Sequence, residues 1–321
     1  MPLLVWVGFF TIYLLLLGLD LGVLHRESRV LSVHQALGWT LIWILVALGF
    51  GGLVYGLYEY QWFGRGDLLA AVTGHDAVVQ FITGYVLEWS LSVDNIFVIA
   101  IIFTYMQVPV VYQYRVLFWG IVGAIVLRGA MIAAGAALIH AFDWMFYVFG
   151  AILVLSAARM LKSEDDEYDP GRSVLVRLVR QVYPITDKLD GERFFTRIDG
   201  KRAATPLFVT LLFVDLADVV FAVDSIPAIF AVTQDPFIVF TSNAFAILGL
   251  RSLYFAVAGL MALFKYLKIS LVFILGFVGI KMMLHHHVQI SNLLSLLVIL
   301  SCLLTGVLAS VWSGRPASRD E

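Results

Sequence analysis

Charge is scarce in this sequence, and cysteine is nearly absent. Only 14% of the 321 residues are charged, whereas a soluble domain carries about 25%, so an ordinary soluble protein is excluded. The single cysteine, Cys302, rules out an internal disulfide framework and a cysteine-cluster metal site. The formal net charge of −2 indicates no partner by itself, because the charges are unevenly distributed along the chain. A hydrophobic fraction of 61% instead predicts a polytopic membrane protein.

The motifs of common enzyme and nucleic-acid-binding classes are also missing. The sequence has no glycine-rich phosphate loop, no nucleophile elbow and no basic stripe of the kind that binds nucleic acid. We therefore expect neither an enzyme nor a nucleic-acid partner, and no cofactor. The first apolar run has no basic segment before it and no small-residue cleavage site after it, so we expect a retained helix rather than a signal peptide.

Long apolar stretches, of about 18 residues or more, predict transmembrane helices embedded in a lipid bilayer. The predicted fold is all-α with about nine such helices, at 3–24, 37–58, 77–105, 114–140, 144–162, 205–232, 237–263, 269–288 and 291–312. The segment 163–204 is charged, too small for an enzyme domain, and contains a possible amphipathic piece around 174–182. Lysine and arginine gather in the loops that share one side when the N-terminus is outside, so the positive-inside rule predicts N outside and C inside.

Two acidic motifs inside apolar runs are the strongest functional signal, because an ionisable group at membrane depth is costly unless it is paired or functional. Their polar residues are Glu88, Asp94 and Asn95 in the first, and Asp215, Asp218, Asp224 and Ser225 in the second. The predicted topology makes the two helices antiparallel, and the helices that follow them also match. We therefore predict an inverted repeat of helices three to five and six to eight, a recurring plan of secondary transporters.

This repeat gives the expected organisation of the chain. It comprises two peripheral helices (1–75), repeat one (76–162), a charged cytoplasmic loop (163–204), repeat two (205–288), and a ninth helix with a cytoplasmic tail (289–321).

A regular helix does not aim all these oxygens at one ion. Asp224 lies six residues after Asp218, about 9 Å further along the axis and on another face, whereas metal–oxygen bonds are about 2.0–2.6 Å long. Either the helix is interrupted near Ser225–Pro227, or Asp94 and Asp224 meet at the midplane. We favour the second arrangement with some unwinding at Pro227. It predicts outer acids, Glu88 and Asp218, as a relay or second ion position, and a central site of Asp94, Asn95, Asp224 and Ser225.

Two arginines, Arg128 and Arg251, occupy equivalent positions in the predicted repeats. Five acids against two arginines leave three carboxylates uncompensated, a surplus that attracts a divalent cation or holds protons. The arginines either neutralise one acid each or lower the ion affinity for release, and purely structural pairing is the alternative for the acids. Asn243 either adds a carbonyl to the ion path or caps a helix, and Asp20 is interpreted as a solvated helix end.

The donor types limit the ion. Both motifs offer oxygen atoms and no histidine or cysteine, which favours Mg²⁺, Ca²⁺ or Mn²⁺ over Zn²⁺ or Cu²⁺. The His285–His287 run is interpreted as a surface cluster at the outer end of helix eight.

These residues lie in segments that resemble the TerC family, which is named for tellurium resistance and placed with the LysE-type transporter superfamily. The matching segments are Gly84–Asn95, Gly123–Arg128, Phe142–Ala151 and, most specific, Asp218–Arg251. The resemblance implies a nine-helix bacterial inner-membrane protein, similar to members associated with manganese export and metal homeostasis. It places the family's acidic motif positions on Glu88, Asp94, Asn95, Asp218, Asp224 and Ser225.

Some positions depart from the family pattern. Asp215 stands where Glu is expected in many relatives, and Trp89 and Arg159 stand where Lys is expected. The prediction is a membrane transporter that exports a divalent metal ion, with Mn²⁺ as the expected cargo and proton coupling as an option; a Ca²⁺ or Mg²⁺ carrier is a weaker interpretation. The alternative is a non-transporting TerC-type module that binds protein partners through 163–204, in metal or tellurite stress response or in metal delivery.

Overall fold

The computed structural model describes residues 3–20, 32–60, 72–162, 185–186, 189–198, 201–258, 266–285, 287–288 and 290–313. Its helices are α1 (Leu3–Gly18), α2 (Val33–Glu59), α3 (Gly74–Tyr105), α4 (Val110–Ala141), α5 (Met145–Lys162), α7 (Pro206–Phe230), α8 (Pro236–Leu248), α9 (Leu250–Ala258), α10 (Leu267–Met283) and α11 (Asn292–Ser313). Strands β1 (Phe195–Ile198) and β2 (Lys201–Ala204) pair antiparallel just before α7.

Most of these helices suit a bilayer. Within the described residues, six helices are long and apolar enough to cross a membrane, and the bent pair α8 and α9 raises the number to seven if it forms one span. In their described extents α1 has 16 residues and α10 has 17. The prediction of an all-helical polytopic membrane protein is confirmed at this level.

Local sequence chemistry sets several helix starts. Ser32 accepts the Gln35 backbone N–H and the Gln35 side chain accepts from the Ser32 backbone, a capping box that starts α2. The Asp235 side chain accepts from the backbone N–H groups at the start of α8, where Pro236 has no N–H to satisfy. The Tyr58 hydroxyl also donates to Asp235 at 2.6 Å, which ties the end of α2 to this start.

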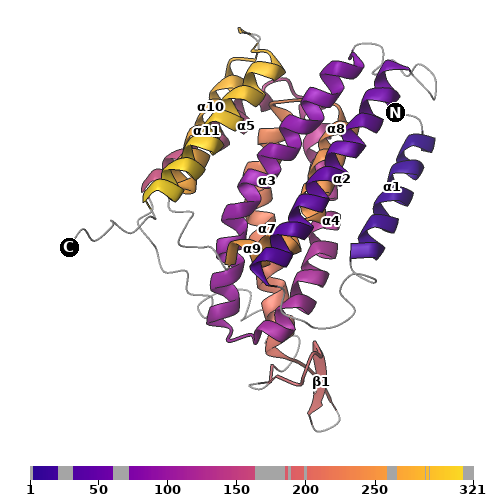
Figure 1. The fold of residues 1–321 in the computed structure, drawn as a ribbon, viewed down its shortest axis with the longest axis vertical. Helices are drawn as coiled ribbons and strands as arrows, with labels where there is room; N and C mark the ends of the chain where they lie inside the picture. The colour runs from indigo at the N-terminus through magenta and orange to yellow at the C-terminus, as the bar shows by residue number, and fades with distance from the viewer. Residues whose placement is uncertain are drawn as a thin grey trace.

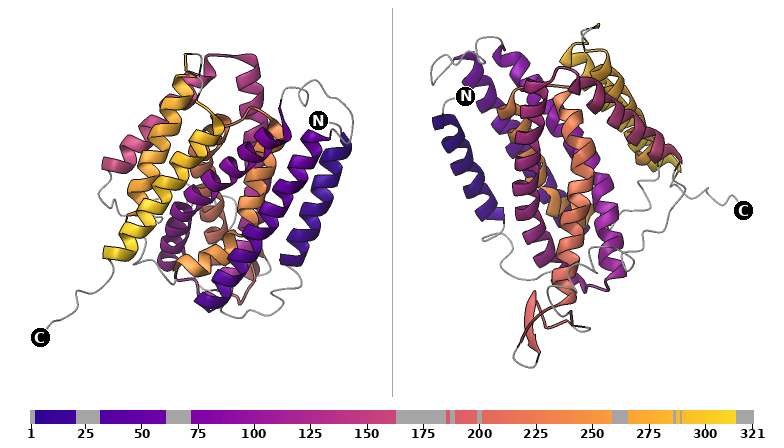
Figure 2. Two further views of the ribbon diagram at one scale, coloured as in Figure 1. Left: turned by 45° about the horizontal axis from the view of Figure 1, so that its top comes forward. Right: turned by 180° about the vertical axis from the view of Figure 1, so that it is seen from behind.

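The helices form a central group with satellites on opposite sides. Figures 1 and 2 show α5, α10 and α11 together on one side, α3, α4, α7 and α8 in the middle, and α1 along the opposite edge. One apolar core lies among α1, α2, α3, α8 and α9, and a second joins α5, α7 and α10. Helices α5 and α10 approach closely because Gly150 faces Gly279: a Cβ on Gly150 would lie 2.8 Å from the Gly279 carbonyl oxygen.

Helices α3 and α7 are antiparallel neighbours. Gly84, early in α3, faces Ile229 at the end of α7. The two helices pack against each other. The helices that carry the two acidic motifs are therefore neighbours.

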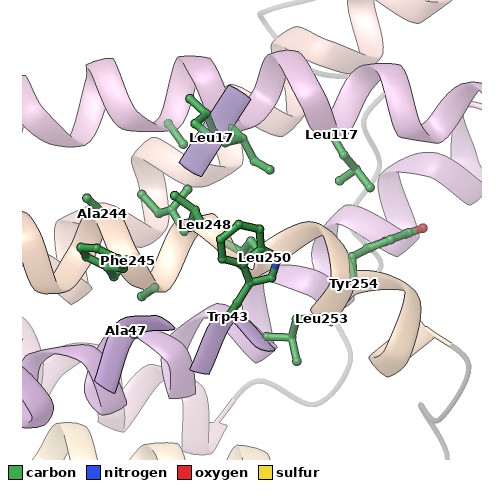
Figure 3. Packing of buried hydrophobic residues seen from close by; sticks show 14 of the residues in the cluster. Leu17, Trp43, Ala47, Leu117, Ala244, Phe245, Leu248, Leu250, Leu253 and Tyr254 are labelled. Atoms are coloured by element: carbon green, nitrogen blue, oxygen red, sulfur yellow. The ribbon is translucent and has the colours of Figure 1, made fainter. Parts of the chain in front are cut away.

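The stretch predicted as one helix at 237–263 is bent. Helices α8 and α9 meet at Gly249 with an angle of 47° between them. Trp43 of α2 packs against this point, and a Cβ on Gly249 would lie 3.1 Å from the Trp43 Cβ. Figure 3 shows the Trp43 ring among Leu248, Leu250 and Leu253.

The unwinding expected at Pro227 does not occur. Helix α7 runs from Pro206 to Phe230 with Pro227 inside it. The residues around Pro227 are buried by helix packing. After the proline, the Ala231 N–H donates to the Pro227 carbonyl at 3.0 Å, so helical hydrogen bonding continues to the end of α7. The acids of α7 therefore keep the spacing of a regular helix.

A β-hairpin was not predicted from the sequence. It occupies the end of the charged segment 163–204, with Phe195 opposite Ala204 and Ile198 opposite Lys201. The amphipathic piece expected around 174–182 lies outside the described residues.

Candidate functional site

One buried guanidinium joins the two acidic motifs. Arg128 of α4 donates from Nε to Asp218 Oδ2 at 2.9 Å and from Nη2 to Asp218 Oδ1 at 2.5 Å. Its Nη1 forms an ion pair with Glu88 Oε1 of α3. The Arg128 and Glu88 side chains are 1% and 0% exposed. This forked arrangement is the strong, directional type of ion pair, and it uses the acids that correspond to each other in the two motifs.

Glycines of α4 make room for a third acid. A Cβ on Gly123 would lie 2.8 Å from Asp215 Oδ1, and one on Gly120 would lie 3.2 Å from Val214 Cγ1. The α4–α7 interface can therefore close around the Asp215 carboxylate. Its Oδ1 is buried and has no hydrogen-bond partner among the described residues, and Asp215 is close enough to Asp218 for their charges to interact.

A small cavity of about 30 Å³ adjoins this cluster. Its polar walls are Asn95, Asp218 and Arg251, and the rest of its lining is apolar or glycine. Asn95 is 4% exposed, and its Oδ1 accepts no hydrogen bond from the described residues. A space of this size holds about one water-sized particle, and the oxygen donors on its wall are the Asn95 amide and the Asp218 carboxylate.

Arg251 has a different environment from Arg128. Its Nη2 donates to the Asp20 main-chain oxygen at 2.7 Å and to Asp20 Oδ1 at 3.0 Å, and its guanidinium lies 4.8 Å from the centre of the Tyr114 ring. Asp20 is 2% exposed, so its interpretation as a solvated helix end is wrong. The two arginines therefore do not play equivalent parts in this structure: Arg128 bridges both motifs, whereas Arg251 fastens the end of α1 to α9.

Asp224 faces helix α5 rather than the Arg128 cluster. Its Oδ1 accepts a hydrogen bond from Ser156 Oγ at 2.6 Å. Both residues line a cleft of about 520 Å³ between α5 and α7, together with Arg159 and apolar side chains. The cleft brings a carboxylate, a hydroxyl and an arginine to a space open at the protein surface.

Asp94 is half-buried and lies within electrostatic reach of Lys268, in the first turn of α10. Ser225 and Asn243 are each 2% exposed, and neither Ser225 Oγ nor Asn243 Nδ2 has a hydrogen-bond partner among the described residues. The helix start near Asn243 is capped by Asp235 instead. The predicted site residues thus lie in helices α3, α7 and α8, but they face three different environments.

The described residues contain no group of three or more His, Cys, Asp or Glu side chains placed to hold a metal ion. The acids have separate partners. Arg128 forms ion pairs with Glu88 and Asp218, Asp224 accepts a hydrogen bond from Ser156, and Asp94 lies within electrostatic reach of Lys268 in α10. His285 stacks on Phe146 with ring centres 4.6 Å apart, and His286 lies outside the described residues.

Sequence reasoning missed Asp20 and Ser156 as partners of site residues. Asp20 carries a detectable signal, because a carboxylate ending an apolar run must find solvent or a counter-charge. Ser156 carries none: it is one hydroxyl within α5, and only the packing of α5 against α7 brings it to Asp224.

Comparison with known proteins gives a consistent picture. Residues 73–318 match the model of the family described as "Integral membrane protein TerC family". A Myxococcus xanthus protein named "Uncharacterized membrane protein STKORF319" is 45% identical, over 98% of this chain and 94% of its own. An Escherichia coli K12 protein named "Putative membrane-bound redox modulator Alx" is 44% identical, over 96% of this chain and 94% of its own. A Rickettsia bellii membrane protein is 40% identical over 95% and 96%. No solved structure matches.

Proposed function

This chain belongs to the TerC family of integral membrane proteins, and from that premise we propose that it exports a divalent metal ion, with Mn²⁺ as the first candidate. The observation that carries the proposal is the buried charge around Arg128. Glu88, Asp215 and Asp218 set three carboxylates against one guanidinium, which leaves a formal charge of −2. Uncompensated charge in this setting costs several kcal/mol, and one divalent cation offsets a charge of −2.

Arg128 acts in this proposal as a resident counter-ion. When no metal is bound, the guanidinium pairs with both Glu88 and Asp218 and offsets one of their two negative charges. An arriving divalent ion competes for Asp218, Asp215 and the free Asn95 oxygen, and the arginine reclaims Asp218 as the ion leaves. The carboxylate and amide oxygens suit a hard cation. Arg128 thereby lowers the affinity for the ion to a level that permits release.

The cleft between α5 and α7 provides the approach. Asp224 and Ser156 would meet the ion there first, with Asp94, Ser225 and Asn243 contributing as the helices rearrange. Arg159 in the cleft limits how long a cation dwells at Asp224. Proton coupling fits the same groups, because each carboxylate that releases a metal is able to take up a proton.

The proposal includes nine spans, an inverted repeat and an N-terminus outside the bacterial inner membrane. The helices that the repeat relates are in contact, but so are α4 with α7 and α3 with α8, which it does not relate. The proposed repeat is supported by the matching acidic motifs of α3 and α7. The relatives come from bacteria, which supports the location.

A second candidate function is a membrane module that acts through protein partners. The name of the Escherichia coli relative refers to redox modulation, and the segment 163–204 is the largest hydrophilic part of the chain. This chain has one cysteine, Cys302, so it cannot form an internal disulfide for thiol exchange. A redox effect would then arise through a partner or through the supply of a metal.

Metal uptake into everted vesicles tests export directly. Vesicles that contain the protein should accumulate Mn²⁺, more strongly with a pH gradient if protons are coupled, and parallel assays with Mg²⁺ and Ca²⁺ define the cargo. Asp94→Asn and Asp224→Asn should each abolish uptake. Asp143→Asn, at an exposed acid between α4 and α5, is the matched control and should leave it unchanged. Uptake that survives both motif variants, with function lost only when the charges of 163–204 are removed, rejects transport in favour of the partner module.

A further inference from the structure

The β-hairpin before α7 presents an unusual pair of arginines. In its register Arg197 lies directly opposite Arg202. Directly opposed residues of an antiparallel pair project from the same face of the hairpin, and like charges in that position repel each other. The hairpin therefore holds two guanidinium groups together at a cost, unless an anion lies between them.

A third arginine adds to this charge. Arg193, Arg197 and Arg202 line one hollow of about 600 Å³, with Phe195 and Thr196. The Arg193 side chain is 75% exposed, and its Nη1 lies 3.6 Å from Asp190 Oδ2. An ion pair of this kind at the surface contributes little to stability. Among the described residues, no carboxylate forms a salt bridge with Arg197 or Arg202. Among these residues, the hollow thus carries an excess of positive charge on a two-stranded base.

The hairpin is held where a membrane span begins. Only Thr205 separates β2 from α7, and its side chain donates to the Arg193 and Phe194 carbonyls at 2.7 and 3.1 Å. The Phe195 ring lies 4.5 Å from that of Phe208, in the first turn of α7. At about 3.3 Å per extended residue, Arg202 is at most about 13 Å from the first residue of the span. Figure 1 shows the hairpin projecting from this end of the helical group.

We propose that the arginine hollow of the hairpin binds the phosphate of an anionic phospholipid headgroup. Its position beside the start of a transmembrane helix favours a lipid over a soluble anion, because headgroups are concentrated at that depth. Guanidinium groups bind phosphate oxygens through paired N–H donors. Phe195 adds an aromatic ring of the kind that residues at the membrane interface commonly supply. The bound phosphate relieves the Arg197–Arg202 repulsion and fixes the hairpin to the membrane surface.

Lipid titration of the full-length protein tests the proposal. The purified protein in an uncharged detergent is titrated with phosphatidylglycerol or with phosphatidylcholine of the same acyl chains, and bound lipid is counted by native mass spectrometry. We expect tighter binding of phosphatidylglycerol. Arg197→Gln and Arg202→Gln should each weaken it about fivefold, the effect of one basic residue near an anionic surface, while Arg197→Lys retains most of it.

Lys162→Gln is the matched control, since Lys162 is an exposed cation at the end of α5, and it should bind phosphatidylglycerol as the unmodified protein does. Thermal unfolding of each variant checks that the helical part is intact. Equal binding of the two lipids overturns the proposal, as does an unchanged affinity in both arginine variants or an equal loss in the control. Inorganic phosphate bound in the hollow without any preference for phosphatidylglycerol also overturns it.

Discussion

Removing the guanidinium of Arg128 should destabilise the protein strongly. Arg128→Gln leaves Glu88, which is fully buried, and Asp218 without their counter-charge. Breaking a buried ion pair from one side costs about 3–5 kcal/mol. Replacing all three charges, as in Glu88→Gln, Arg128→Met and Asp218→Asn together, removes the two acids that Arg128→Gln leaves unpaired and should return the free energy of unfolding to near the wild-type value.

The single cysteine provides the assay. Cys302 lies half-buried in α11, so a thiol-reactive dye reports its exposure during thermal or detergent-induced unfolding without any engineered label. The two acids of Arg128→Gln should also bind added cation. At Mn²⁺ one hundred times above its dissociation constant, a bound ion stabilises the fold by about 2.7 kcal/mol, and we expect a larger Mn²⁺-induced rise in unfolding temperature in Arg128→Gln than in the unmodified protein.

Two outcomes would refute this reasoning. If Arg128→Gln unfolds under the same conditions as the unmodified protein, the guanidinium does not compensate buried acids. If Mn²⁺ stabilises the unmodified protein and Arg128→Gln equally, the arginine and the metal do not compete for the same carboxylates, and the exchange proposed for Arg128 fails even if the protein transports metal.

Two further substitutions probe the neighbouring acids. Ser156→Ala removes the hydroxyl that donates to Asp224 and should lower Mn²⁺ uptake, whereas Ser156→Thr keeps a hydroxyl and should keep the uptake. A hydrogen bond to a charged group contributes about 1.5–3 kcal/mol, and the open cleft places this one at the low end of that range. Unchanged uptake in Ser156→Ala would contradict a role for that hydroxyl. Gly123→Ala inserts a methyl group 2.8 Å from Asp215 Oδ1 and should cost about 1–3 kcal/mol of stability, measured by dye exposure, whereas Gly276→Ala, with nothing within 4 Å, should not destabilise. Equal unfolding of the two glycine variants would show that the α4–α7 contact around Asp215 is loose.

The helices of the central group could be located from sequence, but their breaks could not. The predicted 77–105 and 205–232 correspond to α3 (Gly74–Tyr105) and α7 (Pro206–Phe230), because each is a long apolar run with a capping or breaking residue at its start. At Gly249, where the helix bends, Trp43 of α2 packs against the backbone, a contact between distant parts of the chain that the sequence does not reveal. Proline is a poor guide here, since α7 continues through Pro227.

The hairpin could have been predicted from the sequence, whereas the partners in the ion pairs could not. The sequence Asp199-Gly200 between two short runs is a standard hairpin turn signal. In contrast, the sequence shows that Arg128 lies among acids but not which ones it holds. That Arg128 takes two acids while Arg251 takes Asp20 follows from how α4, α7 and the end of α1 pack, and this packing decides which carboxylates stay uncompensated.

The attachment of the hairpin to α7 has a practical consequence. Because Thr205 and the Phe195–Phe208 contact tie β1 to the first turn of the helix, a tilt of α7 in the hydrocarbon must swing the hairpin in water. A spectroscopic probe on the hairpin therefore reads the motion of the helix that carries Asp215, Asp218 and Asp224 from outside the bilayer. Lipids that hold the hairpin still would, by the same linkage, restrain that motion.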